Sequence, residues 1–245
     1  MPPLIPFVKQ LPAGRTALAV RVASDADAET VAAALNLPAP HALLILSGGA
    51  GQTADAMLRR LTSLFDAIGA ALARQGVTVI DGGTQSGVMA LMGQALDRSG
   101  HTAPYIGVLP AHAPISDDQR GEDILEPHHS HFVLIEADRW GDECDLMGRL
   151  AGRLSERVPS LLLLVNGGEV ALQDLAWNVH QGREIVVLAG SGRLADEIAA
   201  AVCQPEAVAR PEVARVAREG RVTLCDLAEP AAGLVALIES RLAVY

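Results

Sequence analysis

Four glycine-rich turns carry the residues of this sequence best suited to binding an anion. Each follows an apolar, strand-like run, and they lie at 47–52, 82–87, 166–168 and 190–193. A glycine turn between a strand and a helix leaves free backbone N–H groups at the helix N-terminus, where these donors and the helix dipole stabilise a negative charge. Glycine is needed because a Cβ atom would keep the backbone away from the ligand. The alternative is tight strand-to-helix packing without a ligand.

Arginine supplies positive charge near these turns. Arg193 falls in the first turn of a predicted helix, where a cation is unfavourable to the helix dipole, so a bound anion would explain its presence. Arg149, Arg153 and Arg157 form a basic stripe on another predicted helix. Because arginine makes two parallel hydrogen bonds to one phosphate, these residues favour a phosphate-bearing ligand. The alternative is a solvated helix face.

Carboxylates offer a second kind of chemistry, cleavage of an N-glycosidic bond. Such a reaction needs a carboxylate near the ribose C1′ to stabilise an oxocarbenium-like transition state. Glu136, Glu169 and Asp174 are the candidates that the sequence places best. The acidic segment that begins at Glu136 and includes Glu143 has two interpretations. One of its carboxylates supplies general acid–base chemistry, or the segment is an acidic surface around a helix N-terminus. Trp140 lies in this segment and either stacks on a base or packs in the core.

Three histidines, His128, His129 and His131, lie close enough in sequence to raise the question of a metal site. No cysteine or second histidine pair completes a ligand set, so we expect no bound metal. His131 precedes a predicted strand, and we expect it to be a hydrogen-bonding structural residue.

A parallel sheet must position these groups. The strand-like runs are almost wholly apolar and alternate with amphipathic helices, which indicates a parallel sheet covered on both faces. Right-handed crossovers place every strand's carboxyl end at one edge, where open α/β sheets bind ligands. We therefore predict an α/β fold, Rossmann-like and doubly wound, with a mainly parallel sheet flanked by helices on both faces. The predicted strands are 16–22, 42–46, 77–80, 105–109, 132–135, 161–165, 185–188 and 222–224, and the predicted helices are 26–35, 57–72, 89–99, 146–158, 172–179, 195–202 and 231–242.

Three segments have no clear periodicity. Residues 1–14 are rich in proline and are expected to cover the surface, and 205–211 reads as a break or a short helix. Residues 110–130 form a long polar loop, which we expect at the rim of a site.

Composition narrows the function. The 245 residues are 50% hydrophobic and only 3% aromatic, which is enough for an aliphatic core in one large domain or two small ones. Because no composition shift marks a second domain, we predict a single domain over 1–245. A net charge of −10 argues against nucleic-acid binding. Three cysteines without metal-ligand spacing indicate reduced thiols in a cytoplasmic protein. No signal peptide or bilayer-spanning apolar run is visible, so we expect no direct membrane insertion.

Taken in order, the turns resemble those of the SLOG superfamily of Rossmann-like nucleotide-binding domains. The closest resemblance is to the LSDAT group, shared by prokaryotic proteins and the cytosolic N-terminal region of melastatin-type TRP channels. It covers roughly 42–202, and 1–41 and 203–245 are expected to add flanking strands and helices. The matching segments are Leu46–Ala50, Asp81–Val88, Ile106–Val108, His129–Ile135, Leu161–Gly168 and Ala189–Asp196.

The resemblance implies a nucleotide-derived ligand, with ADP-ribose and related NAD metabolites as leading candidates. Related phosphoribohydrolases carry PGGxGTxxE at the third turn, and this chain lacks the Gly-Thr pair there, which argues against that activity. The binding residues carried over from the family, together with the wall opposite and the fourth turn, are Ser47, Gly48, Gly49, Gln52, Gly82, Gly83, Thr84, Gly87, Arg149 or Arg153, Gly167, Gly168, Gly190, Ser191, Gly192 and Arg193.

We therefore expect a non-catalytic protein that senses a nucleotide derivative and needs no other cofactor. One alternative is a hydrolase that cleaves an N-glycosidic bond of a nucleotide or NAD. Another is a scaffold subunit without a ligand. We expect a homo-oligomer, and the output of a sensor would pass to a separate effector protein.

Overall fold

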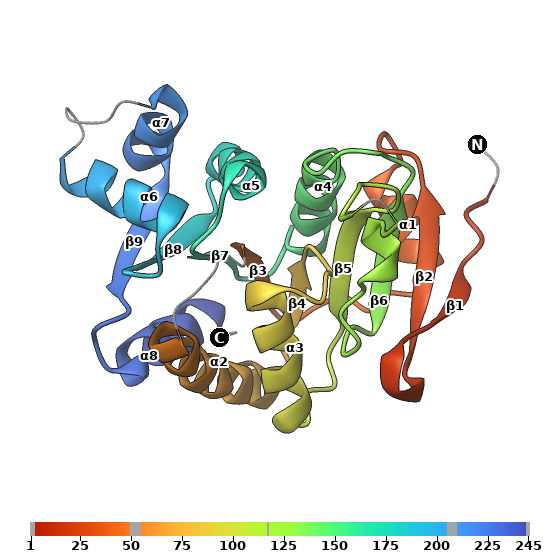
Figure 1. Ribbon diagram of the computed structural model, residues 1–245, viewed down its shortest axis with the longest axis horizontal. Coiled ribbons are helices and arrows are strands. Elements are labelled where there is room, and N and C mark those ends of the chain that lie inside the picture. The colour runs from red at the N-terminus through yellow and green to blue at the C-terminus, as the bar shows by residue number, and fades with distance from the viewer. Residues whose placement is uncertain (1–2, 50–54, 117, 205–209, 244–245) are drawn as a thin grey trace.

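The computed structural model describes residues 3–49, 55–116, 118–204 and 210–243. The strands are β1 (Phe7–Gln10), β2 (Thr16–Val22), β3 (Leu43–Gly48), β4 (Thr78–Asp81), β5 (Tyr105–Pro110), β6 (His131–Ile135), β7 (Ser160–Val165), β8 (Glu184–Ala189) and β9 (Arg221–Asp226). They form one sheet in the order β1-β2-β6-β5-β4-β3-β7-β8-β9 (Figure 1). Only β1 runs antiparallel to its neighbour, so the predicted α/β fold with a mainly parallel sheet is confirmed.

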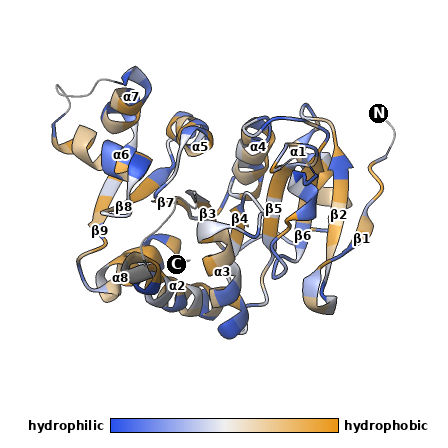
Figure 2. Cartoon of the chain, viewed as in Figure 1, coloured by the Kyte–Doolittle hydropathy of each residue, from blue (hydrophilic) through white to orange (hydrophobic). Residues whose placement is uncertain are grey.

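Helices cover both faces of this sheet, as predicted. They are α1 (Ala28–Ala34), α2 (Asp55–Gln75), α3 (Gly87–Arg98), α4 (Cys144–Leu154), α5 (Glu169–His180), α6 (Arg193–Cys203), α7 (Pro211–Glu219) and α8 (Ala231–Leu242). On one face α2 packs against α3 and α8, and on the other α1, α4, α5, α7 and α6 follow one another across the sheet (Figure 1). The strands between them are mostly hydrophobic (Figure 2). The five residues Leu161–Val165 of β7 are all fully buried, because helices cover both of their faces.

The structure differs from the sequence prediction in two elements. Residues 7–10 form the edge strand β1, where the prediction had only a surface segment. A four-residue strand has little pattern of its own and forms because β2 is there to pair with it. The second difference is α7, which starts at Pro211. The sequence predicts a break or a short helix over 205–211 and no helix from there to residue 231. Proline at the first helical position is favourable because its missing N–H would have no partner there.

Sheet topology brings the first and third glycine turns together. From β3 the chain adds β4, β5 and β6 on one side and then returns to place β7 on the other side. Gly48 at the end of β3 is paired with Val165 at the end of β7. The strand order therefore reverses beside β3, and the loops after β3 and β7 diverge there, which is where open α/β sheets bind ligands.

Candidate functional site

A cavity of about 540 Å³ lies at the carboxyl ends of β3, β4 and β7. Its volume is within the range of small-molecule sites. The first, second and third turns form its walls, together with the N-terminal half of α5 and the loops before α4. The lining residues are Leu46, Ser47, Gly48, Gly49, Gly82, Thr84, Ser86, Met89, Ile115, Ile124, Trp140, Glu143, Met147, Gly168, Glu169, Val170, Ala171, Asp174 and Arg193.

Arg193 extends from the fourth turn to the first and third turns. Its guanidinium lies across the first and third turns, so that a Cβ atom at Gly168 would be 2.7 Å from Nη2 and one at Gly49 would be 3.7 Å from Nη1. The preceding Gly192 has φ +101°, which turns the backbone sharply before α6. A side chain at position 168 would therefore displace the guanidinium of Arg193 from its present position. Arg193 makes no hydrogen bond or ion pair with another described residue, so its donors face the cavity.

The floor of the cavity contains Asp174, a buried carboxylate on α5. Its Oδ2 accepts a hydrogen bond of 2.7 Å from the Ser47 hydroxyl. Its Oδ1 is buried and has no hydrogen-bond partner among the described residues. Burial raises the pKa of Asp174 to about 6, although the hydrogen bond from Ser47 acts in the opposite direction. No cation contacts this carboxylate within the described part of the chain.

Glu143 is a second buried acid in the same wall. The N–H of Gly141 donates a 2.6 Å hydrogen bond to its carboxylate. Burial raises the pKa of Glu143 to about 7, and the negative charge of Asp174 adds to this shift. Both acids therefore titrate close to neutral pH, which is the property of groups that can accept or release a proton in a reaction.

The end of the cavity away from Arg193 is apolar. Met89, Ile115, Ile124, Trp140 and Met147 line it. The indole N–H of Trp140 donates to the carbonyl of Pro114 at 3.1 Å, which fixes the orientation of the ring. The cavity thus combines a cationic end, a polar floor and an apolar end with an aromatic ring, which suits a phosphate joined to a ribose and a base.

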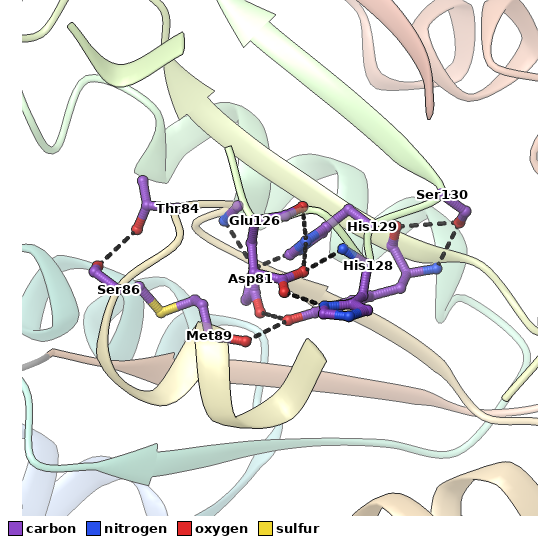
Figure 3. Close-up of polar contacts among 10 residues, drawn as sticks. Asp81, Thr84, Ser86, Met89, Glu126, His128, His129 and Ser130 are labelled. Carbon is purple, nitrogen blue, oxygen red and sulfur yellow. Dashed lines mark hydrogen bonds and ion pairs between the residues drawn. The ribbon is translucent and has the colours of Figure 1, made fainter. Parts of the chain in front are cut away.

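A buried ionic network supports the second turn from behind (Figure 3). Asp81, the last residue of β4, accepts hydrogen bonds from the Tyr105 hydroxyl at 2.5 Å and from the N–H of Gly83 at 2.7 Å. The N–H of Glu126 donates to the carbonyl of Gly83 at 2.9 Å. Both polar groups of this glycine are therefore held, so the network fixes the turn that presents Gly82 to the cavity.

His129 neutralises part of this network. Its Nε2 lies 2.9 Å from Asp81 and its Nδ1 lies 2.9 Å from Glu126. Burial alone would lower the pKa of His129, but the charge and hydrogen bonds of the two carboxylates outweigh it and raise the pKa to about 9. The ring is therefore an imidazolium at neutral pH that donates to both acids. His128 also contacts Glu126, through Nδ1 at 2.5 Å.

The predicted binding residues fall into four groups, of which the two arginines of α4 are treated below. Gln52 lies outside the described residues. The residues on the cavity wall are Ser47, Gly48, Gly49, Gly82, Thr84, Gly168 and Arg193, with Glu169 and Asp174 of the catalytic candidates. The residues that belong to the turns but do not line the cavity are Gly83, Gly87, Gly167, Gly190, Ser191 and Gly192.

Three predicted site residues are not brought to this cavity. Arg149 binds Asp145 and the carbonyls of Ser24 and Ala26. Arg153 pairs with Glu29. Glu136 is exposed and contacts His112 and Arg21. Arg149 and Arg153 face α1 and the segment before it, and periodicity alone could not show which neighbour they meet. Arg157 lies beyond the end of α4 at Leu154, so the predicted helix 146–158 was too long and the stripe has only two members on the helix.

Sequence reasoning missed the role of His129. It left Glu143 between acid–base chemistry and an acidic surface, and Trp140 between stacking on a base and packing; the structure brings both to the cavity wall. Glu126 lies in a segment that read as plain loop, so nothing local paired it with Asp81. His131 contacts the Ser130 hydroxyl at 2.8 Å, in line with its expected structural role. Among the described residues no group of three or more His, Cys, Asp or Glu is arranged to hold a metal ion. Within the same residues no helix is both long and apolar enough to cross a bilayer.

Comparison with known proteins shows what the chain is similar to. Residues 41–236 match the family model described as "SLOG in TRPM, prokaryote", a longer range than the predicted 42–202. Transient receptor potential cation channel subfamily M member 2 of mouse is 26% identical over 210 residues, which cover 69% of this chain and 14% of the channel. Member 5 from human is 35% identical over 104 residues, 37% of this chain and 9% of the channel. The chain thus spans a small part of the relatives it matches.

Proposed function

The chain belongs to the SLOG family in its prokaryotic, TRPM-related form, and on this basis we propose that it binds a nucleotide-derived ligand in the cavity beside β3. ADP-ribose or a related NAD metabolite is the leading candidate. The observation that carries the proposal is the position of Arg193 across two glycine turns, where its donors are available to a pyrophosphate.

In this proposal the rest of the ligand occupies the remainder of the cavity. With the phosphates at Arg193, the ribose lies over Ser47 and the base reaches the apolar end at Trp140. A flat base gains stabilisation from an aromatic ring of fixed orientation. The role is sensing without catalysis and without a further cofactor. We also propose a cytoplasmic location, because the three cysteines, all described, are free.

Calorimetric titration of the purified protein with ADP-ribose, NAD, cyclic ADP-ribose and AMP tests this function. We expect at least one of them to bind, and Arg193→Ala to weaken that binding. The matched control is Arg98→Ala, since Arg98 pairs with Asp66 and does not line the cavity. Absence of binding by all four at millimolar concentration would overturn the proposal.

The second candidate function is hydrolysis of an N-glycosidic bond. It is favoured by two buried acids in the cavity whose pKa values are raised to about 6 and about 7. Release of the free base, followed by chromatography, would support it if Asp174→Asn or Glu143→Gln abolished the release. Intact ligand after prolonged incubation supports sensing instead.

The oligomeric state and the partner of the protein are also proposals. We propose a homo-oligomer that passes its signal to a separate effector protein. Light scattering coupled to size-exclusion chromatography gives the mass in solution, and a monomer at every concentration would exclude the oligomer. A third role, that of a ligand-free scaffold, is favoured if the protein is oligomeric and none of the four nucleotides binds.

A further inference from the structure

A second cavity, of about 560 Å³, lies at the opposite edge of the sheet. The first residues of three strands reach it: Ser160 of β7, Glu184 of β8 and Arg221 of β9. The length of β7, about 17 Å, separates this edge from the nucleotide cavity.

Arg183 is the unusual member of this lining. It is only 7% exposed, yet it contacts no carboxylate among the described residues. Its hydrogen bonds go to neutral oxygens, from Nε to the Ser160 hydroxyl at 2.9 Å, from Nη1 to Asn178 Oδ1 at 2.6 Å and from Nη2 to the Ser155 hydroxyl at 2.7 Å. Each Nη nitrogen carries two hydrogens, so each keeps one N–H without an acceptor within the described chain.

Burying a charge without an opposite charge is costly. Burial lowers the pKa of Arg183 to about 10, which reflects that cost. The carbonyl ends of α4 and α5 nearby offset part of the charge. An anion in the cavity would offset the rest.

The other charged groups of the lining leave a positive excess. Arg221 donates to the carbonyl of Gly182 at 3.3 Å, and Arg241 pairs with Glu184 at 3.1 Å. Glu156 is 64% exposed and contacts Arg153 outside the cavity. Three arginines thus face two glutamates in a protein whose net charge is −10.

We propose that this cavity is a second binding site, for a phosphate group. Arginine forks and a serine hydroxyl are the donors that recognise tetrahedral oxoanions. The hydroxyl of Ser160 accepts from Arg183 and donates to no described residue, so it is free to donate to the ligand. The site is independent of the nucleotide cavity and of the function proposed for it.

Titration with inorganic phosphate, pyrophosphate and glucose 6-phosphate tests the site, at constant ionic strength set with chloride. The Arg193→Ala protein is used so that phosphate binding at the glycine turns is weakened and contributes less. We expect binding that moves the ¹⁵N-detected amide signals of Gly152 and Gly182, which line the cavity. The probe that binds with the highest affinity shows whether the site prefers free phosphate or a phosphate ester.

Substitutions at the rim leave Arg183 and its structural contacts in place. Arg221→Gln and Arg241→Gln should each weaken phosphate binding about tenfold, the loss expected for one charged hydrogen bond. Arg98→Gln makes the same change of charge elsewhere and should leave the affinity unchanged. Equal effects of all three variants, or no shift of the Gly152 and Gly182 signals, would show that Arg183 only ties α4 to α5 and that there is no phosphate site.

Discussion

Two clusters of buried carboxylates lie at the carboxyl edge of the sheet, and they differ in their partners. Asp81 and Glu126 share the imidazolium of His129. Asp174 and Glu143 are bonded only to neutral donors within the described residues. A compensated cluster can stabilise the backbone around it, whereas an uncompensated one is costly to the fold. The first cluster therefore holds a turn in place, and the second has the properties of a functional site.

Breaking the compensated cluster should have the largest effect. Asp81→Asn leaves the His129 charge with one carboxylate instead of two, and we expect the free energy of unfolding to fall by about 3–5 kcal/mol. Urea denaturation at pH 7 measures it. Asp66→Asn is the control, because that half-exposed carboxylate pairs with Arg98 at the surface and contacts no residue of the cluster. A loss below about 1 kcal/mol for Asp81→Asn, the scale of a surface pair, would contradict the comparison.

The contribution of the same cluster to the free energy of unfolding should depend on pH. The pKa of His129 is raised from 6.5 to about 9, so the stabilisation is complete below pH 6.5 and is lost as the pH rises through 9. The shift corresponds to about 3 kcal/mol. The difference between the parent and Asp81→Asn should therefore narrow across this window. A difference that is constant from pH 6 to pH 10 would mean that His129 is neutral.

Removing a carboxylate from the uncompensated cluster should raise the free energy of unfolding instead of lowering it. Asp174→Asn removes a buried charge and still accepts the Ser47 hydroxyl. The pKa of Asp174 is raised from 3.8 to about 6, so its favourable contribution is present below pH 3.8 and is lost as the pH passes 6. At pH 8 the variant should be more stable by up to about 3 kcal/mol, and at pH 3 the two proteins should be equal. Thermal melts at both pH values decide this, and a destabilised variant at pH 8 would show that the charge is compensated.

Arg193→Ala should affect the ligand and spare the fold. We expect nucleotide binding to weaken by about 1.5–3 kcal/mol, the scale of hydrogen bonds to charged groups, with partial recovery in Arg193→Lys. The melting temperature without ligand should barely change, because the side chain is exposed. Calorimetry gives the affinity. Equal affinity of parent and variant would place the phosphates elsewhere.

Glu136→Gln should have the smallest effect of all. This exposed carboxylate does not line the cavity and pairs with Arg21 and His112 at the surface. We expect changes within about 0.5 kcal/mol in both stability and ligand affinity. A large loss of ligand binding would extend the site beyond the described cavity.

Much of the fold could be predicted because local pattern and burial agree. Strands buried on both faces read as apolar runs, as at Leu161–Val165, and helices such as α8 (Ala231–Leu242) were predicted to the residue. The two elements that the sequence did not predict depend on the residues and strands around them. β1 is a short strand that needs β2, and α7 begins at a proline that can also end a segment.

The amino-acid sequence by itself determined the glycine turns, their order along the chain and therefore the edge of the sheet at which they gather. Parallel strands joined by right-handed crossovers leave no other place for them. Tertiary structure alone decided the partners of the charged side chains. Arg193 crosses two turns, Arg149 and Arg153 meet α1 and the segment before it, and His129 joins Asp81 and Glu126 across 48 and 3 positions of the chain. Long side chains reach whichever element packs beside them, and the periodicity of one element carries no information about its neighbour.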